Sequence, residues 1–183
     1  MKRIFITCCW LACLLLAASP LASADSLTDA RLLKAAYLYN FAKLTVWPED
    51  SFSEPKLPFI LCITGKDELV ENIKQLSGKT IHGHPVSIRT LQNGQSPANC
   101  HLLYIATSDR QNFPDIIKSV TNLPVLTVSE LPYFAYEGGI IELYSDVNRT
   151  RFLINPTVAL KQGLQISSRL LNMSIVIDGR EKP

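Results

Sequence analysis

The chain has 183 residues, of which 47% are hydrophobic and 19% are charged, and 18 basic and 16 acidic residues give it a formal net charge of +2. Two of the basic residues, Lys2 and Arg3, belong to an N-terminal segment with the features of a secretory signal, so the mature chain is formally neutral. A neutral chain offers no whole-protein electrostatic reason to bind nucleic acid or an anionic membrane, and neither is expected as a partner.

Residues 1–24 are predicted to be a cleaved secretory signal peptide. Two basic residues precede an apolar run over residues 4–18, and an Ala-Ser-Ala sequence ending at Ala24 forms the cleavage site. The apolar run is short for a membrane span, so we expect residues 25–183 to be exported as one domain without direct membrane insertion. A lipoprotein acylated at Cys13 is the alternative, which Trp10 disfavours because a small aliphatic residue is expected there.

Residues 31–48 are predicted to form the first helix of the folded domain, ended by Pro48. Apolar residues recur at spacings of three and four, which is typical of an amphipathic helix. The stripe expected to face the core consists of Leu33, Ala36, Tyr37, Asn40, Phe41 and Leu44. Because a buried amide needs hydrogen-bond partners, Asn40 either bonds a neighbouring backbone or lines a pocket.

Strands and helices then alternate along the chain. Continuous apolar runs are typical of buried strands, and one run alternates with period two, as a strand with one solvated face does. The predicted strands cover residues 58–64, 85–91, 101–106 and 124–129, with helices at 67–76 and ending near Val120.

The pattern changes in the last third of the chain. Residues 139–144 and 150–155 alternate around a turn-prone segment and predict a β-hairpin with Ile141, Leu143, Phe152 and Ile154 packed. Asn155 and Pro156 are suited to begin a helix, predicted to run to about Leu171, before an edge strand at 174–178. These elements predict an α/β three-layer sandwich with a mixed, mostly parallel sheet, helices on both faces and a late antiparallel hairpin.

Two cysteines, Cys62 and Cys100, remain after removal of the signal peptide. Both lie at predicted buried strands, and an even number of cysteines in an exported chain favours one disulfide between neighbouring strands. Two buried thiols are the alternative. A redox-active pair is less favoured, because the chain has no Cys-x-x-Cys motif.

We find no motif for catalysis, a metal or a cofactor, and we expect none of them. His82 and His84 form the only close histidine pair, and a metal site would need a third ligand, which His101 could supply only from a neighbouring strand. A solvated turn is the simpler interpretation of the pair. Ser167 and Ser168 lack the elbow motif of a nucleophilic serine, so the chain is not expected to be an enzyme.

Motifs found from the first helix to the end of the chain match those of one protein family. The first helix reads Lys-Ala-Ala-Tyr-Leu-Tyr-Asn-Phe-x-Lys-x-x-x-Trp-Pro at residues 34–48. It is followed by Cys62 before Thr-Gly, a His-Gly-His-Pro turn at 82–85, Cys100 before His, Arg-Phe-x-Ile-Asn at 151–155, and Gly-Leu-x-Ile-Ser-Ser-x-Leu-Leu at 163–171. In these motifs the chain resembles the YfiR family of bacterial periplasmic proteins.

The resemblance implies a regulatory role in the periplasm, without catalysis or a cofactor. Proteins of this family repress a membrane-bound diguanylate cyclase by binding its periplasmic sensor region, which lowers cyclic di-GMP and biofilm formation. The resemblance also implies a homodimer and assigns Cys62 and Cys100 to the structural disulfide of the family. Some members carry a second cysteine pair in the region matching residues 139–152, and this chain has none there, which argues against a redox switch based on that bridge.

A repressor of this kind needs an exposed patch for its partner. Aromatic residues anchor protein interfaces. The candidates for partner contact are Tyr39 on the first helix and Tyr133, Phe134 and Tyr136 in a later loop. Core packing is the alternative interpretation of aromatic residues in these segments.

The second hypothesis is a periplasmic small-molecule-binding sensor that acts on another envelope receptor. Its ligand pocket would lie near Asn40, Asn155 and Arg169.

Overall fold

The computed structural model describes residues 23–52, 57–92, 94–146 and 149–178. Its contacts divide the chain into two units, residues 1–30 and 31–183. The described part of the first unit, residues 23–30, is helical. Most of the predicted signal peptide lies outside the described residues, so cleavage after Ala24 stays a prediction. No helix in the described segments combines the length and apolar content that a membrane crossing requires.

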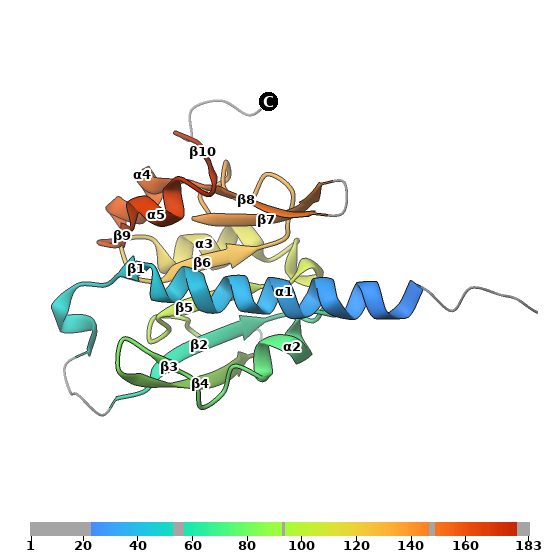
Figure 1. Ribbon diagram of the computed structural model, residues 1–183. Helices are drawn as coiled ribbons and strands as arrows, with labels where there is room; N and C mark the ends of the chain where they lie inside the picture. Colours follow the sequence, from blue (N-terminus) through green and yellow to red (C-terminus); the bar gives the residue numbers. More distant parts are fainter. Residues whose placement is uncertain (1–22, 53–56, 93, 147–148, 179–183) are drawn as a thin grey trace, which may run out of the picture. The chain divides into compact units, whose positions relative to one another are not determined.

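Helices and strands follow one another along the described residues (Figure 1). The helices are α1 (Ser23–Lys43), α2 (Val70–Lys74), α3 (Phe113–Val120), α4 (Pro156–Lys161) and α5 (Ser168–Leu171), with 3-10 helices η1 (Glu49–Phe52) and η2 (Thr107–Asp109). The strands are β1 (Thr45–Val46), β2 (Phe59–Thr64), β3 (Thr80–Ile81), β4 (His84–Leu91), β5 (Leu102–Ile105), β6 (Leu126–Ser129), β7 (Ile141–Asp146), β8 (Arg149–Ile154), β9 (Gln165–Ile166) and β10 (Ile175–Val176).

Within the described residues, one 8-stranded sheet has the order β10-β8-β7-β6-β5-β2-β4-β3, and β1 pairs separately with β9. The pairs β2–β4, β2–β5, β5–β6, β6–β7 and β8–β10 are parallel, whereas β3–β4 and β7–β8 are antiparallel. In the hairpin β7–β8, Ile141 lies opposite Ile154 and Leu143 opposite Phe152, and all four are buried as predicted. The predicted mixed, mostly parallel sheet with a late antiparallel hairpin is therefore confirmed.

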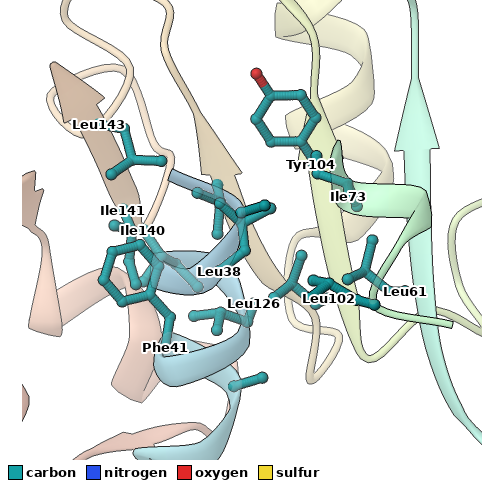
Figure 2. Close-up of a cluster of buried hydrophobic side chains, with 14 of the residues drawn as sticks. Leu38, Phe41, Leu61, Ile73, Leu102, Tyr104, Leu126, Ile140, Ile141 and Leu143 are labelled. Carbon is teal, nitrogen blue, oxygen red and sulfur yellow. The ribbon is translucent and has the colours of Figure 1, made fainter. Parts of the chain in front are cut away.

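Helices cover both faces of the sheet, because its central strands are apolar on both sides. In β2, Ile63 belongs to the hydrophobic cluster that contains Leu38 and Phe41 of α1, whereas Cys62 belongs to a second cluster with Phe113 of α3. Figure 2 shows the first cluster, in which side chains of α1 lie against apolar side chains of the sheet. Each large apolar side chain buried in this way contributes about 1.5–3 kcal/mol.

The buried face of α1 differs from the predicted stripe. Its buried residues are Ala35, Leu38, Phe41 and Ala42. Asn40 is exposed, so the prediction that its amide lies on the core face is wrong. The helix carries apolar residues on more than one side, and its buried face includes the small residues Ala35 and Ala42. Hydrophobic periodicity alone does not distinguish these two faces.

The C-terminal segment is not the single helix predicted to reach Leu171. It begins as expected, because the Asn155 side chain accepts a hydrogen bond from the Val158 N–H and Pro156 occupies the first turn of α4. The helix ends at Lys161, and Gly163 then adopts a φ of +76°. The chain continues into β9, which pairs with the distant β1, and this tertiary pairing overrides the local helical pattern.

Cys62 and Cys100 form the predicted disulfide, with their Cα atoms 5.8 Å apart. It joins β2 to the segment just before β5, and these strands are parallel neighbours in the sheet. Both cysteines lie in the hydrophobic cluster that contains Phe113 and Val120 of α3. The bond therefore joins adjacent strands on the α3 face of the sheet.

Removing this disulfide should destabilise the fold. The bond joins residues separated by 38 positions, and closing a loop of this size restricts the unfolded chain by an amount worth about 3–4 kcal/mol. The free energy of unfolding of Cys62→Ala/Cys100→Ala, measured by urea denaturation, is expected to fall by that amount. Dithiothreitol should lower the wild type to the same stability and leave the variant unchanged. A variant as stable as the oxidised wild type would contradict this prediction.

Candidate functional site

An aromatic turn, residues 131–139, follows the carboxyl end of β6. The N–H groups of Tyr136 and Glu137 each donate to the Tyr133 carbonyl at 3.0 Å, and the Gly139 N–H donates to the Phe134 carbonyl at 2.9 Å. The turn contains three of the residues predicted to contact a partner, Tyr133, Phe134 and Tyr136. The structure thus brings these three together in one short, internally bonded segment.

Tyr133 is the exposed aromatic residue of the aromatic turn, with 44% of its surface accessible. Its φ is +66°, in the left-handed region that costs a non-glycine residue about 1–2 kcal/mol. Its ring lies 6.4 Å from that of half-buried Tyr136 in an edge-to-face arrangement. Strained residues persist only where the surrounding structure determines them, and they concentrate at functional sites.

Phe134 is fully buried, so core packing is the interpretation that the structure supports for this residue. Its ring lies 5.2 Å from the ring of Phe113 on α3. The ring also covers Gly139 so closely that a Cβ at this position would overlap it. Phe134 therefore anchors the aromatic turn, and Gly139 is needed for the close approach.

Glu142 on β7 fixes the backbone of the aromatic turn. Its Oε1 accepts a hydrogen bond from the Tyr133 N–H and its Oε2 accepts one from the Ala135 N–H, both at 3.2 Å. The residue is only 8% exposed. Burial raises the pKa of this carboxyl, the two backbone hydrogen bonds oppose the rise, and the neighbouring charge of Glu137 adds to it. Glu142 was not among the predicted site residues, because its signal in the sequence is a single acidic residue inside an apolar strand.

Asn155, which follows β8 at the same end of the hairpin as Glu142, holds the same turn. Its Nδ2 donates to the Ala135 carbonyl at 2.9 Å, and its Oδ1 accepts from the Val158 N–H at 3.0 Å. The residue is 2% exposed. Both ends of the amide are engaged within the fold, so Asn155 joins the aromatic turn to α4.

A comparison with known protein families finds a model described as YfiR/HmsC-like that matches residues 31–175. The chain belongs to the YfiR/HmsC-like family. A comparison with curated proteins finds no match. The matched range includes the aromatic turn, Glu142 and Asn155, so the family match agrees with the resemblance that the motifs predict.

The other predicted site residues of this YfiR/HmsC-like chain lie on α1 (Tyr39 and Asn40) and α5 (Arg169). The Tyr39 hydroxyl donates to the Thr80 carbonyl at 2.8 Å, and the Lys43 ammonium lies 5.4 Å from the Tyr39 ring centre. Asn40 and Arg169 are both exposed. Two cavities among the described residues, of about 470 and 250 Å³, are lined by none of Asn40, Asn155 and Arg169.

The histidines belong to an aromatic cluster around η1. The Phe52 ring lies 4.4 Å from the ring of His84 and 4.6 Å from that of His101. His84 is 9% exposed, so the interpretation as a solvated turn is wrong for this residue. His101 accepts a hydrogen bond from the Ile60 N–H at 2.9 Å through its Nδ1, and burial lowers its pKa. Across the described residues, no group of three or more His, Cys, Asp or Glu side chains is arranged to hold a metal.

Glu142→Gln should destabilise the protein in a pH-dependent way. Glutamine supplies one acceptor and turns an NH₂ group toward the second backbone N–H, a loss of about 1–3 kcal/mol in the free energy of unfolding. Because the folded state raises the pKa of Glu142 above the usual 4.5, native wild type binds more protons than the unfolded chain just above that pH. The stability contributed by this group is then complete at low pH and declines as pH rises.

Urea denaturation at a series of pH values from about 4 to 7 checks this sign. The difference in the free energy of unfolding between wild type and Glu142→Gln is expected to be largest at the lowest pH and to decrease toward neutral pH. Glu71→Gln, which changes an exposed carboxylate on α2, serves as the control and should show little change. A gap that grows as pH rises would mean that the two backbone hydrogen bonds outweigh the cost of burying the charge.

Proposed function

We propose that this protein is a periplasmic repressor of a membrane-bound diguanylate cyclase. It binds the periplasmic sensor region of the cyclase, acts as a homodimer, and thereby lowers cyclic di-GMP and biofilm formation. The observation that carries the proposal is the YfiR/HmsC-like family match over residues 31–175. Membership in this family supports a regulatory role in the periplasm, and no catalytic step by this chain is part of the proposal.

Repression by binding requires only that the repressor bind one conformation of the cyclase sensor more tightly than another. A partner that binds one conformation of the cyclase sensor shifts its population toward that conformation, and a shift from 1:99 to 99:1 requires a preference of about 10⁴-fold. Such a preference is supplied by a few well-placed anchors, most often aromatic residues or arginine. A surface that presents a rigid aromatic side chain is therefore what this function asks of the fold.

The aromatic turn meets this requirement better than the other predicted contact residues. Tyr133 is substantially exposed, and its unfavourable backbone conformation is maintained by hydrogen bonds to the buried carboxylate of Glu142. A backbone fixed in this way loses little conformational entropy on binding. Tyr136 extends the surface, whereas Phe134 is buried and Tyr39 is engaged with Thr80. We assign the cyclase contact to Tyr133 and Tyr136.

Deletion of the gene should raise cellular cyclic di-GMP, and wild-type complementation should restore the low level. Complementation with Tyr133→Gly should fail, and its binding to the purified sensor region should be at least about tenfold weaker, as for an anchor residue. Glycine adopts a φ of +66° freely, so relief of strain offsets the extra freedom of the unfolded chain. The free energy of unfolding should therefore change by less than about 1 kcal/mol.

Asn122→Gly is the matched control, because Asn122 also has a positive φ, +64°, and is exposed just after α3. This variant should repress as wild type does. Unchanged cyclic di-GMP on deletion under several growth conditions would refute the repressor proposal itself. Full repression by Tyr133→Gly would refute only the assignment of the contact to the aromatic turn.

A further inference from the structure

A polar cavity of about 470 Å³ lies at the carboxyl ends of β2 and β4. Thr64 ends β2, Gln92 follows β4, and one face of α3 with the residue before it contributes Asn112, Asp115 and Ile116. The volume lies in the range of about 300–1,000 Å³ that is usual for small-molecule sites. Neither the aromatic turn nor any residue assigned to partner contact lines this cavity.

The topology of the sheet favours a ligand at this position. β2 lies between β4 and β5 and is parallel to both. The connection from β2 to β4 includes α2, whose buried residues belong to the same hydrophobic cluster as α1, whereas α3 after β5 belongs to the second cluster. The chain therefore continues from β2 toward one edge of the sheet, to β4, and from β5 toward the opposite edge, to β6. In parallel α/β sheets, ligands bind outside the carboxyl ends of the strands where the order diverges.

Thr64 supplies an independent sign of an unfilled polar site. The residue is 7% exposed, it lines the cavity, and its Oγ1 has no hydrogen-bond partner among the described residues. Leaving a buried hydroxyl unpaired is unfavourable, and valine would fill the same space without this cost. The threonine at this position therefore places beside the cavity a hydroxyl that has no partner among the described residues.

The charge of the lining defines the class of ligand. Asp109, 8% exposed, and Asp115 bring two carboxylates to the cavity, and its described lining contains no Lys, Arg or His. None of the ion pairs between described residues includes either aspartate. The Asp109 Oδ1 accepts a hydrogen bond from the Asn112 Nδ2 at 3.3 Å. Buried carboxylates are stable when a cation pairs with them.

The backbone is shaped to let Asp109 approach β2. Gly65, directly after Thr64, has a φ of +71°, and a Cβ there would lie 2.6 Å from the Ser108 Oγ and 3.0 Å from the Asp109 Cγ. The Ser108 Oγ also accepts a hydrogen bond from the Lys66 N–H at 2.7 Å. Glycine is thus required for Asp109 to lie beside the end of β2.

We propose that this cavity binds a small organic cation that carries hydroxyl groups. Its ammonium pairs with Asp109 and Asp115, a hydroxyl bonds the Oγ1 of Thr64, and its carbon skeleton lies against Ile116. The site is independent of the proposed cyclase repression, which assigns no ligand to it. Glucosamine and glucose form a matched pair of probes, because glucosamine carries an ammonium group where glucose carries a hydroxyl.

The test is a titration of the ¹⁵N-labelled mature chain with each sugar, followed by NMR. Glucosamine should cause saturable shifts of the backbone amides of Thr64, Asp109 and Asn112, and glucose should bind at least about tenfold more weakly, since it lacks the charge-assisted bond. No saturable shift with glucosamine, or equal binding of the two sugars, would overturn the proposal.

Two variants separate a ligand site from a structural role. Thr64→Val should weaken glucosamine binding at least about fivefold while the melting temperature stays the same or rises, because an unpaired hydroxyl is removed. Asp115→Asn changes an exposed carboxylate and should weaken binding about tenfold or more. Glu71→Gln is the control for loss of a carboxylate outside the cavity and should bind normally. Unchanged affinity in both Thr64→Val and Asp115→Asn would also overturn the proposal.

Discussion

The burial of β2 on both faces is the constraint on which the fold depends. Ile63 and Cys62 face different hydrophobic clusters, so the strand has to be covered by helices on both sides. Its parallel pairing with β4 requires a crossover connection, which is supplied by the segment that contains α2 and β3. The chain then passes from β4 to β5, on the other side of β2. The disulfide from Cys62 to Cys100 ties this central strand to the start of β5.

The aromatic turn follows from a second constraint, the placement of polar groups inside the hairpin. Glu142 and Asn155 are both buried, and each bonds a backbone group of the turn. Buried polar groups must be satisfied, and here the satisfying partners are the N–H and carbonyl groups of residues 133 and 135. The unfavourable φ of Tyr133 is thereby built into the hydrogen-bond network of the core.

The sequence predicted those features that depend on local patterns. The apolar runs around Cys62 and Leu126 marked buried strands, and the alternation from Ile141 to Ile154 marked the hairpin. The motifs also predicted the family, and the cysteine count predicted the disulfide. These signals act over a few residues or rest on composition, so tertiary contacts do not change them.

The errors arose where distant contacts decide the outcome. The buried side of α1 is decided by its packing in the hydrophobic cluster, where Ala35 and Ala42 are buried and Asn40 is not. The end of α4 is decided by the pairing of β9 with β1. The role of Glu142 depends on a turn that precedes it in the chain. The polar cavity unites Thr64, Asp109 and Asp115, which no sequence motif connects.

One element, α3, contacts both the aromatic turn and the polar cavity. Phe113 lies against Phe134 of the turn, and Ile117 lies beside Gly138, while Asp115 and Ile116 line the cavity. A ligand that pairs with Asp115 therefore acts on the helix against which the turn is packed. It would alter partner binding only if it distinguished two positions of α3, and a bound partner would then change the affinity for the ligand by the same factor. The carboxyl ends of β2 and β6 lie at the same edge of parallel strands, and α3 is a physical connection between the two sites that such coupling would use.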